Sequence, residues 1–192
     1  MNQHDVQPYD ELRPLEEPGA VWRRSAVLIL LYPKAGEDYI VFMRRTETVA
    51  HHKGQISLPG GGYEPTDPDL TYTALREANE ELGIDPNRVE VLSVMPDVYA
   101  RISFFVITPV IARLRPPANG GNEELVFRPS PDEVAEVIEV PLSALRDHAR
   151  HHTELRTRDN ITYNLHYFTY GPYEIWGATG RIIYEYLKST GY

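Results

Sequence analysis

The stretch GGGYEPTDPDLTYTALREANEELGI, residues 60–84, carries most of what this sequence says about fold and function. Three glycines precede a segment that predicts a helix, because Asp67 can cap its first turn and Pro68 has no N–H to lose there. Gly83 ends the helix, with a proline three residues beyond. A glycine-rich turn therefore leads into a helix with defined ends.

Three carboxylates share one side of this helix. At 100° per residue, Glu77, Glu80 and Glu81 fall within about 100° of one another, at spacing i, i+3 and i+4. The apolar residues gather roughly opposite. We therefore expect the apolar side to be buried and the glutamates, including Glu81, to be exposed.

Most acidic runs are only a solvated helix face. Here, however, the carboxylates stand at the C-terminal end of the helix, where the macrodipole disfavours negative charge, and they also repel one another. A divalent cation offsets both effects, and hard cations such as Mg²⁺ prefer carboxylate oxygens. The pattern favours a metal site. Arg76 could orient one carboxylate through a bidentate ion pair, or it could be an ordinary surface arginine.

A metal site beside a glycine-rich turn indicates phosphate chemistry. A bound cation could bridge phosphate oxygens and activate a water, and a glutamate not fully used as a ligand could accept the proton of that water. The chain has no cysteine, and no Ser or His stands in a recognised nucleophile motif. Direct attack by water is therefore preferred over a covalent intermediate.

The stretch resembles the Nudix box, G-x5-E-x7-R-E-U-x-E-E-x-G-U, where U is aliphatic. Asp67 stands where the box has its first glutamate, and eight residues rather than seven separate it from Arg76. The resemblance implies a Nudix fold, a mixed β-sheet sandwiched between α-helices (α/β/α), and Mg²⁺ or Mn²⁺ as cofactor. It implies Glu77, Glu80 and Glu81 as metal ligands, with Arg76 as their orienting partner. The second half of the box matches at Arg76, Glu77, Ala78, Glu80, Glu81, Gly83 and Ile84.

Four segments resemble the coenzyme A diphosphatase-like branch of that family: residues 45–61, the Pro-Thr-Asp spacing of the box, residues 132–142 and residues 175–179. The first corresponds to R-[SA]-x3-R-x3-G-x3-F-P-G-G, from which Thr46, Ala50 and Leu58 depart. Ala50 replaces an arginine that would be a natural anchor for phosphate. The motif is matched at Arg45, Gly54, Pro59, Gly60 and Gly61.

The branch resemblance implies hydrolysis of coenzyme A or acyl-CoA to 3′,5′-ADP and a 4′-phosphopantetheine product. Arg45, His52, Gly60 and Gly61 are then expected to bind substrate. The three glycines, residues 60–62, could cradle phosphate through backbone N–H groups or could form only the tight turn before the helix. ADP-ribose, NADH or a nucleoside triphosphate is the alternative substrate. A nucleotide sensor without hydrolysis is the alternative of another class, and the complete carboxylate set argues against it.

Family members often draw one more catalytic carboxylate from outside the box. Glu133 is our candidate, because it lies just before the strand expected at residues 134–140. Glu123 and Glu124 are rivals, since they lie in a loop expected at residues 115–128. A carboxylate at a surface turn is an equally good interpretation of Glu133.

The length of 192 residues fits one domain, which we place at residues 25–192 after an irregular leader at residues 1–24. The family often forms dimers, so a homodimer is left open. We expect strands at residues 26–32, 39–43, 89–94, 104–114, 134–140 and 161–170, a short helix at residues 141–149 and a final helix at residues 176–187.

Composition excludes several classes of function. A net charge of −9 disfavours a nucleic-acid partner, because phosphate contacts need basic surface. The longest apolar run, residues 26–32, is too short to span a bilayer, and no targeting segment is visible. We therefore expect a cytoplasmic protein without membrane contact, and the family resemblance implies a small nucleotide as its substrate. The absence of cysteine removes disulfides and Cys-based zinc sites.

Two further residue groups have competing interpretations. His51, His52, His148, His151 and His152 invite a zinc hypothesis, but no HExxH or cysteine supports it, so surface histidines are preferred. Trp176 opens an apolar helix and is interpreted as a core residue rather than a ligand platform.

Overall fold

The structure, a computed structural model, describes residues 21–46, 54–101, 103–115, 125–158 and 161–192. Within these residues, eight strands form one sheet whose main path runs β3-β2-β1-β7-β5, with β4 paired to β1, β6 to β7 and β8 to β2. The strands of this sheet are β1 (Arg23–Lys34), β2 (Glu37–Arg45), β3 (Ile56–Ser57), β4 (Gly60–Gly62), β5 (Val89–Val94), β6 (Val98–Ala100), β7 (Phe105–Leu114) and β8 (Val134–Pro141).

A smaller antiparallel sheet has the order β11-β10-β9. Its strands are β9 (His151–Arg158), β10 (Ile161–Tyr170) and β11 (Tyr173–Ile175). The helices are α1 (Leu70–Leu82), α2 (Leu142–Leu145) and α3 (Gly177–Ser189), with 3₁₀ turns η2 (Pro86–Arg88) and η3 (His148–Arg150).

The large sheet is mixed, as predicted. β1 runs parallel to β7 and antiparallel to β2 and β4. Because helices or strands cover both of its faces, β1 is buried on both sides, which explains why residues 26–32 read as a continuous apolar run instead of an alternating one.

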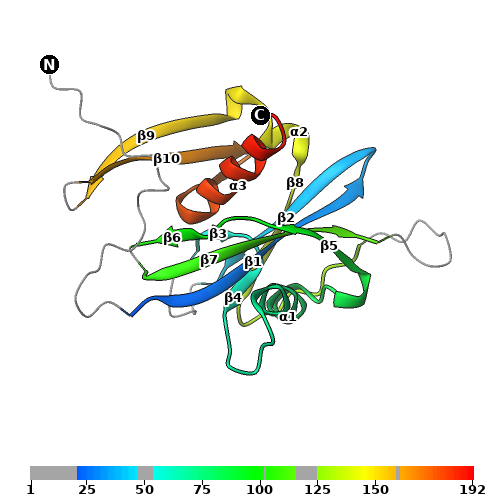
Figure 1. Ribbon diagram of the computed structural model, residues 1–192. Helices are drawn as coiled ribbons and strands as arrows, with labels where there is room; N and C mark the ends of the chain where they lie inside the picture. Colours follow the sequence, from blue (N-terminus) through cyan, green and yellow to red (C-terminus); the bar gives the residue numbers. More distant parts are fainter. Residues whose placement is uncertain (1–20, 47–53, 102, 116–124, 159–160) are drawn as a thin grey trace, which may run out of the picture.

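Two layers enclose the large sheet (Figure 1). α1 lies on one face, where Ala74, Ala78 and Leu82 pack against alternate residues of β1 such as Leu28 and Leu30. α3 covers the other face together with the small sheet, whose residues pack against the remaining alternate positions of β1 and β2. The predicted α/β/α arrangement is confirmed, with a small sheet added to one of its outer layers.

The helix that carries the carboxylates begins later than predicted. Its N-cap is Asp69, whose side chain accepts a hydrogen bond from the Tyr72 N–H at 2.8 Å, rather than Asp67. Asp67 is buried and bonded to other groups, so it is not available as a cap. The C-terminal prediction is confirmed, because Gly83 adopts φ 68° and its N–H donates to carbonyls of the last turn.

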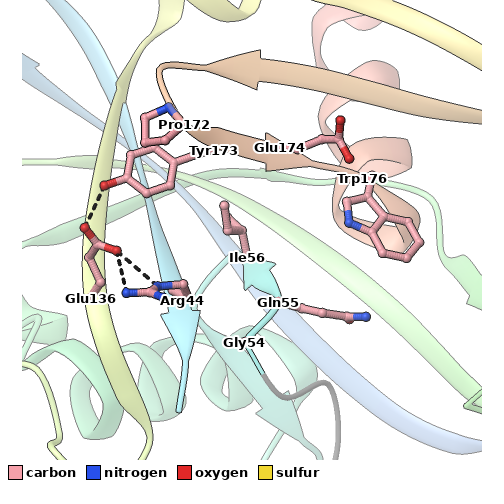
Figure 2. Close-up of a pocket in the computed structure, with 9 residues that line it drawn as sticks. All are labelled: Arg44, Gly54, Gln55, Ile56, Glu136, Pro172, Tyr173, Glu174 and Trp176. Atoms are coloured by element: carbon pink, nitrogen blue, oxygen red, sulfur yellow. Dashed lines mark hydrogen bonds and ion pairs between the residues drawn. The ribbon is translucent and has the colours of Figure 1, made fainter. Parts of the chain in front are cut away.

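The final helix is close to the predicted residues 176–187, whereas the helix predicted at residues 141–149 is only the four residues of α2 followed by the turn η3. Trp176 is the N-cap of α3 and is 42% exposed, so its interpretation as a core residue is wrong (Figure 2). β1 begins at Arg23, inside the span predicted as the leader. Within the described residues, no helix combines the length and apolar character that crossing a bilayer requires.

The histidines of the small sheet are not a uniform surface set. His148 and His152 are exposed, as expected, but His151 is half-buried and its Nε2 lies 3.0 Å from Nδ1 of His166. The phenol of Tyr192 lies 3.1 Å from the other His151 ring nitrogen. These contacts tie the last residue to the small sheet and give His151 a structural role. His51 and His52 lie outside the described residues.

Candidate active site

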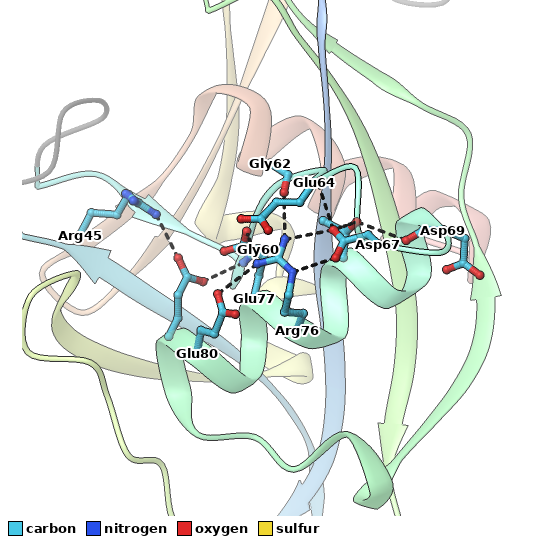
Figure 3. A network of polar contacts seen from close by, with 11 residues as sticks. Arg45, Gly60, Gly62, Glu64, Asp67, Asp69, Arg76, Glu77 and Glu80 are labelled. Atoms are coloured by element: carbon cyan, nitrogen blue, oxygen red, sulfur yellow. Dashed lines mark hydrogen bonds and ion pairs between the residues drawn. The ribbon is translucent and has the colours of Figure 1, made fainter.

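The C-terminal half of α1 presents its carboxylates beside β4 and the turn that follows it (Figure 3). The apolar face of the helix is buried against the large sheet, which fixes the rotation of the helix. Glu77 is half-buried and Glu80 is exposed, and both follow from that rotation.

Arg76 joins the helix to the segment that precedes it. Its Nε and Nη2 atoms donate to the two carboxylate oxygens of Asp67 at 3.0 and 3.1 Å, a bidentate geometry. Nη2 also donates to the Gly62 carbonyl at 3.0 Å. The hydrogen bonds from Arg76 are the main reason why the pKa of Asp67 is lowered to about 2, with further help from the Glu64 N–H and the Thr73 hydroxyl.

The same guanidinium holds two of the predicted metal ligands. Its Nη1 atom lies 3.0 Å from Oε1 of Glu77 and 3.0 Å from Oε2 of Glu80. The side chain of Arg76 is only 15% exposed. Arg76 is therefore a mostly buried residue that pairs with three carboxylates, and not an ordinary surface arginine.

Glu81 differs from expectation, because it is 1% exposed rather than solvent-facing. Its Oε2 accepts the Gly60 N–H at 2.8 Å, and its Oε1 accepts from Nη1 of Arg45 at 3.1 Å. The helical wheel places Glu81 at the border of the acidic side, and the neighbouring strands β2 and β4 cover it.

Burial raises the pKa of Glu81 to about 8. The hydrogen bond from Gly60 and the charge of Arg45 oppose this rise, whereas the charges of Glu77 and Glu133 add to it. Burial likewise raises the pKa of Glu77, with Arg76 opposing and nearby carboxylates adding. The charges of this cluster are therefore mutually unfavourable.

Glu133, the candidate outside the box, lies near the box carboxylates, since its charge acts on both Glu77 and Glu81. It is exposed and immediately precedes β8. The Thr46 N–H donates to its carbonyl at 2.9 Å, which anchors this segment to the end of β2. Its rivals Glu123 and Glu124 lie outside the described residues.

The glycines form a strand, β4, rather than a free turn. It pairs antiparallel with β1, with Gly61 opposite Ala26. Gly60 adopts φ +151°, and a Cβ atom there would lie 2.6 Å from Cα of Val27. A Cβ atom on Gly61 would overlap the Glu77 carboxylate.

Two residues of β4 therefore lie directly against the carboxylates: Gly60 bonds Glu81, and Gly61 leaves room for Glu77. The Gly60 N–H that could cradle phosphate is donated to Glu81 in this structure. Arg45, another predicted substrate-binding residue, also contacts Glu81. The structure thus brings Arg45, Gly60 and Gly61 to one place, whereas His52 and Ala50 lie outside the described residues.

The donor set fits a hard divalent cation in its chemistry. Glu77, Glu80 and Glu81 supply only carboxylate oxygens from adjacent turns of one helix, and their crowded charges would be neutralised by a cation. Across the described ranges, no three His, Asp or Glu side chains are gathered in a geometry that could hold a metal ion. Glu80 is turned to Arg76, and Glu81 to Arg45 and Gly60.

Comparison with known proteins agrees with this geometry. Residues 22–159 match the NUDIX domain. The chain belongs to the Nudix family. A relative from Cronobacter sakazakii, named uncharacterized Nudix hydrolase NudL, is 33% identical over 186 residues, covering 94% of this chain and 90% of the relative. A Salmonella paratyphi B relative of the same name is 30% identical, covering 98% and 94%.

Solved Nudix structures share the fold. A MutT/nudix family protein from Enterococcus faecalis superposes with a TM-score of 0.53 at 15% identity, covering 94% of this chain and 66% of that one. The predicted Nudix fold and the predicted enzyme class, a hydrolase of pyrophosphate linkages, are both confirmed. Nudix hydrolases generally depend on a divalent metal and act on small nucleotide substrates.

The three glycines of this Nudix site should respond differently to alanine. Gly60→Ala should destabilise the fold by about 3 kcal/mol or more, because the new methyl group meets the β1 backbone. Gly61→Ala should preserve the fold and lower kcat at least about tenfold, because it displaces only the end of Glu77. Gly62→Ala is the matched control, with nothing within 4 Å of its Cβ. Thermal unfolding and steady-state hydrolysis measure both effects, and equal behaviour of the three variants would contradict this geometry.

Glu81→Gln should stabilise the metal-free Nudix protein at alkaline pH. Because the folded-state pKa of about 8 exceeds the usual carboxyl value, the folded state binds more protons than the unfolded state at intermediate pH. Ionisation of Glu81 therefore lowers the free energy of unfolding as the pH rises from about 4 to about 8. Glutamine stays neutral and can still accept the Gly60 N–H.

In EDTA at about pH 9, we expect the free energy of unfolding of Glu81→Gln to exceed that of wild type by about 1–2 kcal/mol. At about pH 5, we expect the two proteins to differ little in stability. Glu80→Gln is the control, because Glu80 is exposed and should change stability by less than about 0.5 kcal/mol. Hydrolysis by Glu81→Gln should be largely lost despite the gain in stability. A variant less stable than wild type at alkaline pH would contradict the assignment of a strained, buried carboxylate.

Proposed function

We propose that this Nudix hydrolase holds Mg²⁺ or Mn²⁺ through Glu77, Glu80 and Glu81 and cleaves the pyrophosphate linkage of a nucleoside diphosphate derivative. The observation that carries the proposal is the crowding of these carboxylates. Burial and mutual repulsion raise the pKa of Glu77 and Glu81, which is unfavourable for a purely structural helix end. A cation would remove that repulsion.

The bound cation would supply charge neutralisation at the pyrophosphate oxygens and polarise the attacking water. Arg76 would keep Glu77 in place, since it is anchored by Asp67 and does not depend on substrate. Glu80 has the freedom to turn toward a cation, because it is the most exposed of the three ligands.

We assign Glu133 as the carboxylate that accepts the proton of the attacking water. Three features support it: it is exposed, its charge reaches both Glu77 and Glu81, and its backbone is tied to β2 through Thr46. A base must lie beside the ligands without being fully used by the metal. Glu133 meets that description better than Glu81, which is already bonded to Gly60 and Arg45.

Coenzyme A or an acyl-CoA is the favoured substrate, giving 3′,5′-ADP and a 4′-phosphopantetheine product. Support comes from the four segments that resemble the coenzyme A diphosphatase-like branch. Three residues that match the branch motif contact or adjoin the box carboxylates: Arg45, Gly60 and Gly61. These matches support the position of the catalytic site more than the identity of the substrate. β3, which belongs to the branch-like segment 45–61, contacts β11, whose last residue, Ile175, begins the branch-like segment 175–179.

A substrate panel tests this proposal. The protein is incubated with Mg²⁺ and, separately, coenzyme A, ADP-ribose, NADH and deoxynucleoside triphosphates, and the products are identified by chromatography. We expect coenzyme A to be split at its pyrophosphate, with kcat reduced at least about 100-fold in Glu77→Gln and unchanged in Glu90→Gln, an exposed carboxylate on β5.

Each other outcome of the panel has a defined meaning. Turnover of ADP-ribose but not coenzyme A would overturn the substrate assignment and keep the chemistry. No turnover of any compound, with Mg²⁺ or Mn²⁺, would overturn the proposed activity and favour a nucleotide sensor.

A further inference from the structure

A cleft of about 560 Å³ is lined by residues 54–56, at and just before β3, and by residues of the 172–176 segment around β11 (Figure 2). Its volume is within the range of small-molecule sites. Figure 2 draws Ile56 between Tyr173 and Trp176, and the lining combines this apolar residue with the two aromatic ones. The polar lining includes Arg44, Glu136 and Glu174.

Trp176 is the least expected member of this lining. Its ring stacks on Tyr167 with centroids 6.0 Å apart and an interplanar angle of 15°. Tyr167 stacks in turn on His152, at 4.8 Å and 4°. Trp176 thus ends a row of three nearly parallel rings while 42% of its surface is exposed. A further planar ring could extend this row at the cleft.

The charges of the cleft favour an uncharged ligand group. Arg44 is neutralised by Glu136, with Nη2 and Oε2 3.0 Å apart, and Tyr173 donates its hydroxyl to the same carboxylate at 2.6 Å. Glu174 adds an exposed negative charge. A phosphate would meet net negative charge here, whereas a flat, neutral heterocycle would meet apolar and aromatic walls.

The cleft and the carboxylate site lie at the same end of β2, on opposite faces of the large sheet. Arg44 contacts Glu136 in the cleft, whereas the next residue, Arg45, contacts Glu81. The backbone of Arg45 exchanges hydrogen bonds with Gly54 and Gln55, which line the cleft, at 3.2 and 3.1 Å. A dinucleotide-like molecule with its pyrophosphate at the carboxylates would have to pass this end of β2 to place another group in the cleft.

We propose that this cleft binds the nucleobase of the substrate, stacked on Trp176. The inference rests on the proposed function, because it takes the pyrophosphate position from Glu77, Glu80 and Glu81. It names a specificity-determining residue for that reaction and explains why a large indole is left exposed at the start of α3.

Tryptophan fluorescence tests base stacking without catalysis. The chain has two tryptophans, so Trp22→Phe leaves Trp176 as the only indole, and Trp176→Phe leaves Trp22. Trp22 contacts Tyr99 and Phe104, away from the cleft lining, which makes the two variants a matched pair. In EDTA, 3′,5′-ADP should quench Trp22→Phe in a saturable manner and leave Trp176→Phe unchanged.

Two ligands without a base complete the binding test. Ribose 5-phosphate and 4′-phosphopantetheine should not quench Trp22→Phe. Quenching by 4′-phosphopantetheine but not by 3′,5′-ADP would overturn the proposal, since the cleft would then hold the other half of the substrate. Equal quenching of both variants by 3′,5′-ADP would overturn it as well.

Kinetics provide the second test. Trp176→Ala should raise KM about tenfold, equivalent to about 1.4 kcal/mol, and change kcat less than about twofold, because stacking holds the base and not the reacting bond. Trp176→Phe should restore part of the affinity, and thermal unfolding checks that both variants fold. A fall in kcat with unchanged KM would overturn the base site.

Failure of this inference can be told apart from failure of the proposed function. Saturable quenching without turnover of any substrate would uphold the base site and reject the hydrolytic assignment. Turnover of nucleotide substrates without quenching of Trp22→Phe would uphold the hydrolytic assignment and reject the base site.

Discussion

The bidentate ion pair between Arg76 and Asp67 is the constraint on which the site depends. It ties the segment after β4 to the middle of α1. The other N–H groups of Arg76 contact the Gly62 carbonyl and the carboxylates of Glu77 and Glu80. The side chain of Asp67 is shorter than that of the glutamate in the Nudix box, and Asp67 stands one residue further from Arg76 in the sequence. Both of its carboxylate oxygens nevertheless accept hydrogen bonds from the guanidinium. Removing one partner of such a buried pair is strongly destabilising, because a desolvated charge remains.

Around this pair, the fold brings the carboxylates of Glu77, Glu80 and Glu81 together at a partly buried site. Glu81 is enclosed by β2 and β4, and Gly61 leaves room for Glu77 by having no side chain. Arg45 and the Gly60 N–H compensate part of the charge of Glu81 but leave its pKa raised. The net charge of −9 therefore says less about the ligand than the placement of a few carboxylates does.

The fold was predictable where local pattern and burial agree. The apolar run at residues 26–32 and the Gly83 cap are read correctly, because each rests on a short-range rule. β4 and β9 were not predicted, since three glycines and a polar segment become strands only through pairing with β1 and β10. The helical wheel found the acidic cluster but not the burial of Glu81, which depends on Gly60 and Arg45 arriving from other strands. Trp176 was misassigned because an apolar helix does not show whether its first residue faces the core.

Direct binding of Mn²⁺, followed by the loss of its free-ion paramagnetic resonance signal, tests the central claim that the α1 carboxylates form a metal site. Wild type and the double variant Glu77→Gln/Glu80→Gln are titrated in the absence of nucleotide, so that catalysis and substrate binding play no part. We expect the double variant to bind Mn²⁺ at least about tenfold more weakly than wild type, because two anionic ligands are lost. Equal affinity in the two proteins would contradict the account, since the crowding of Glu77, Glu80 and Glu81 would then serve no cation.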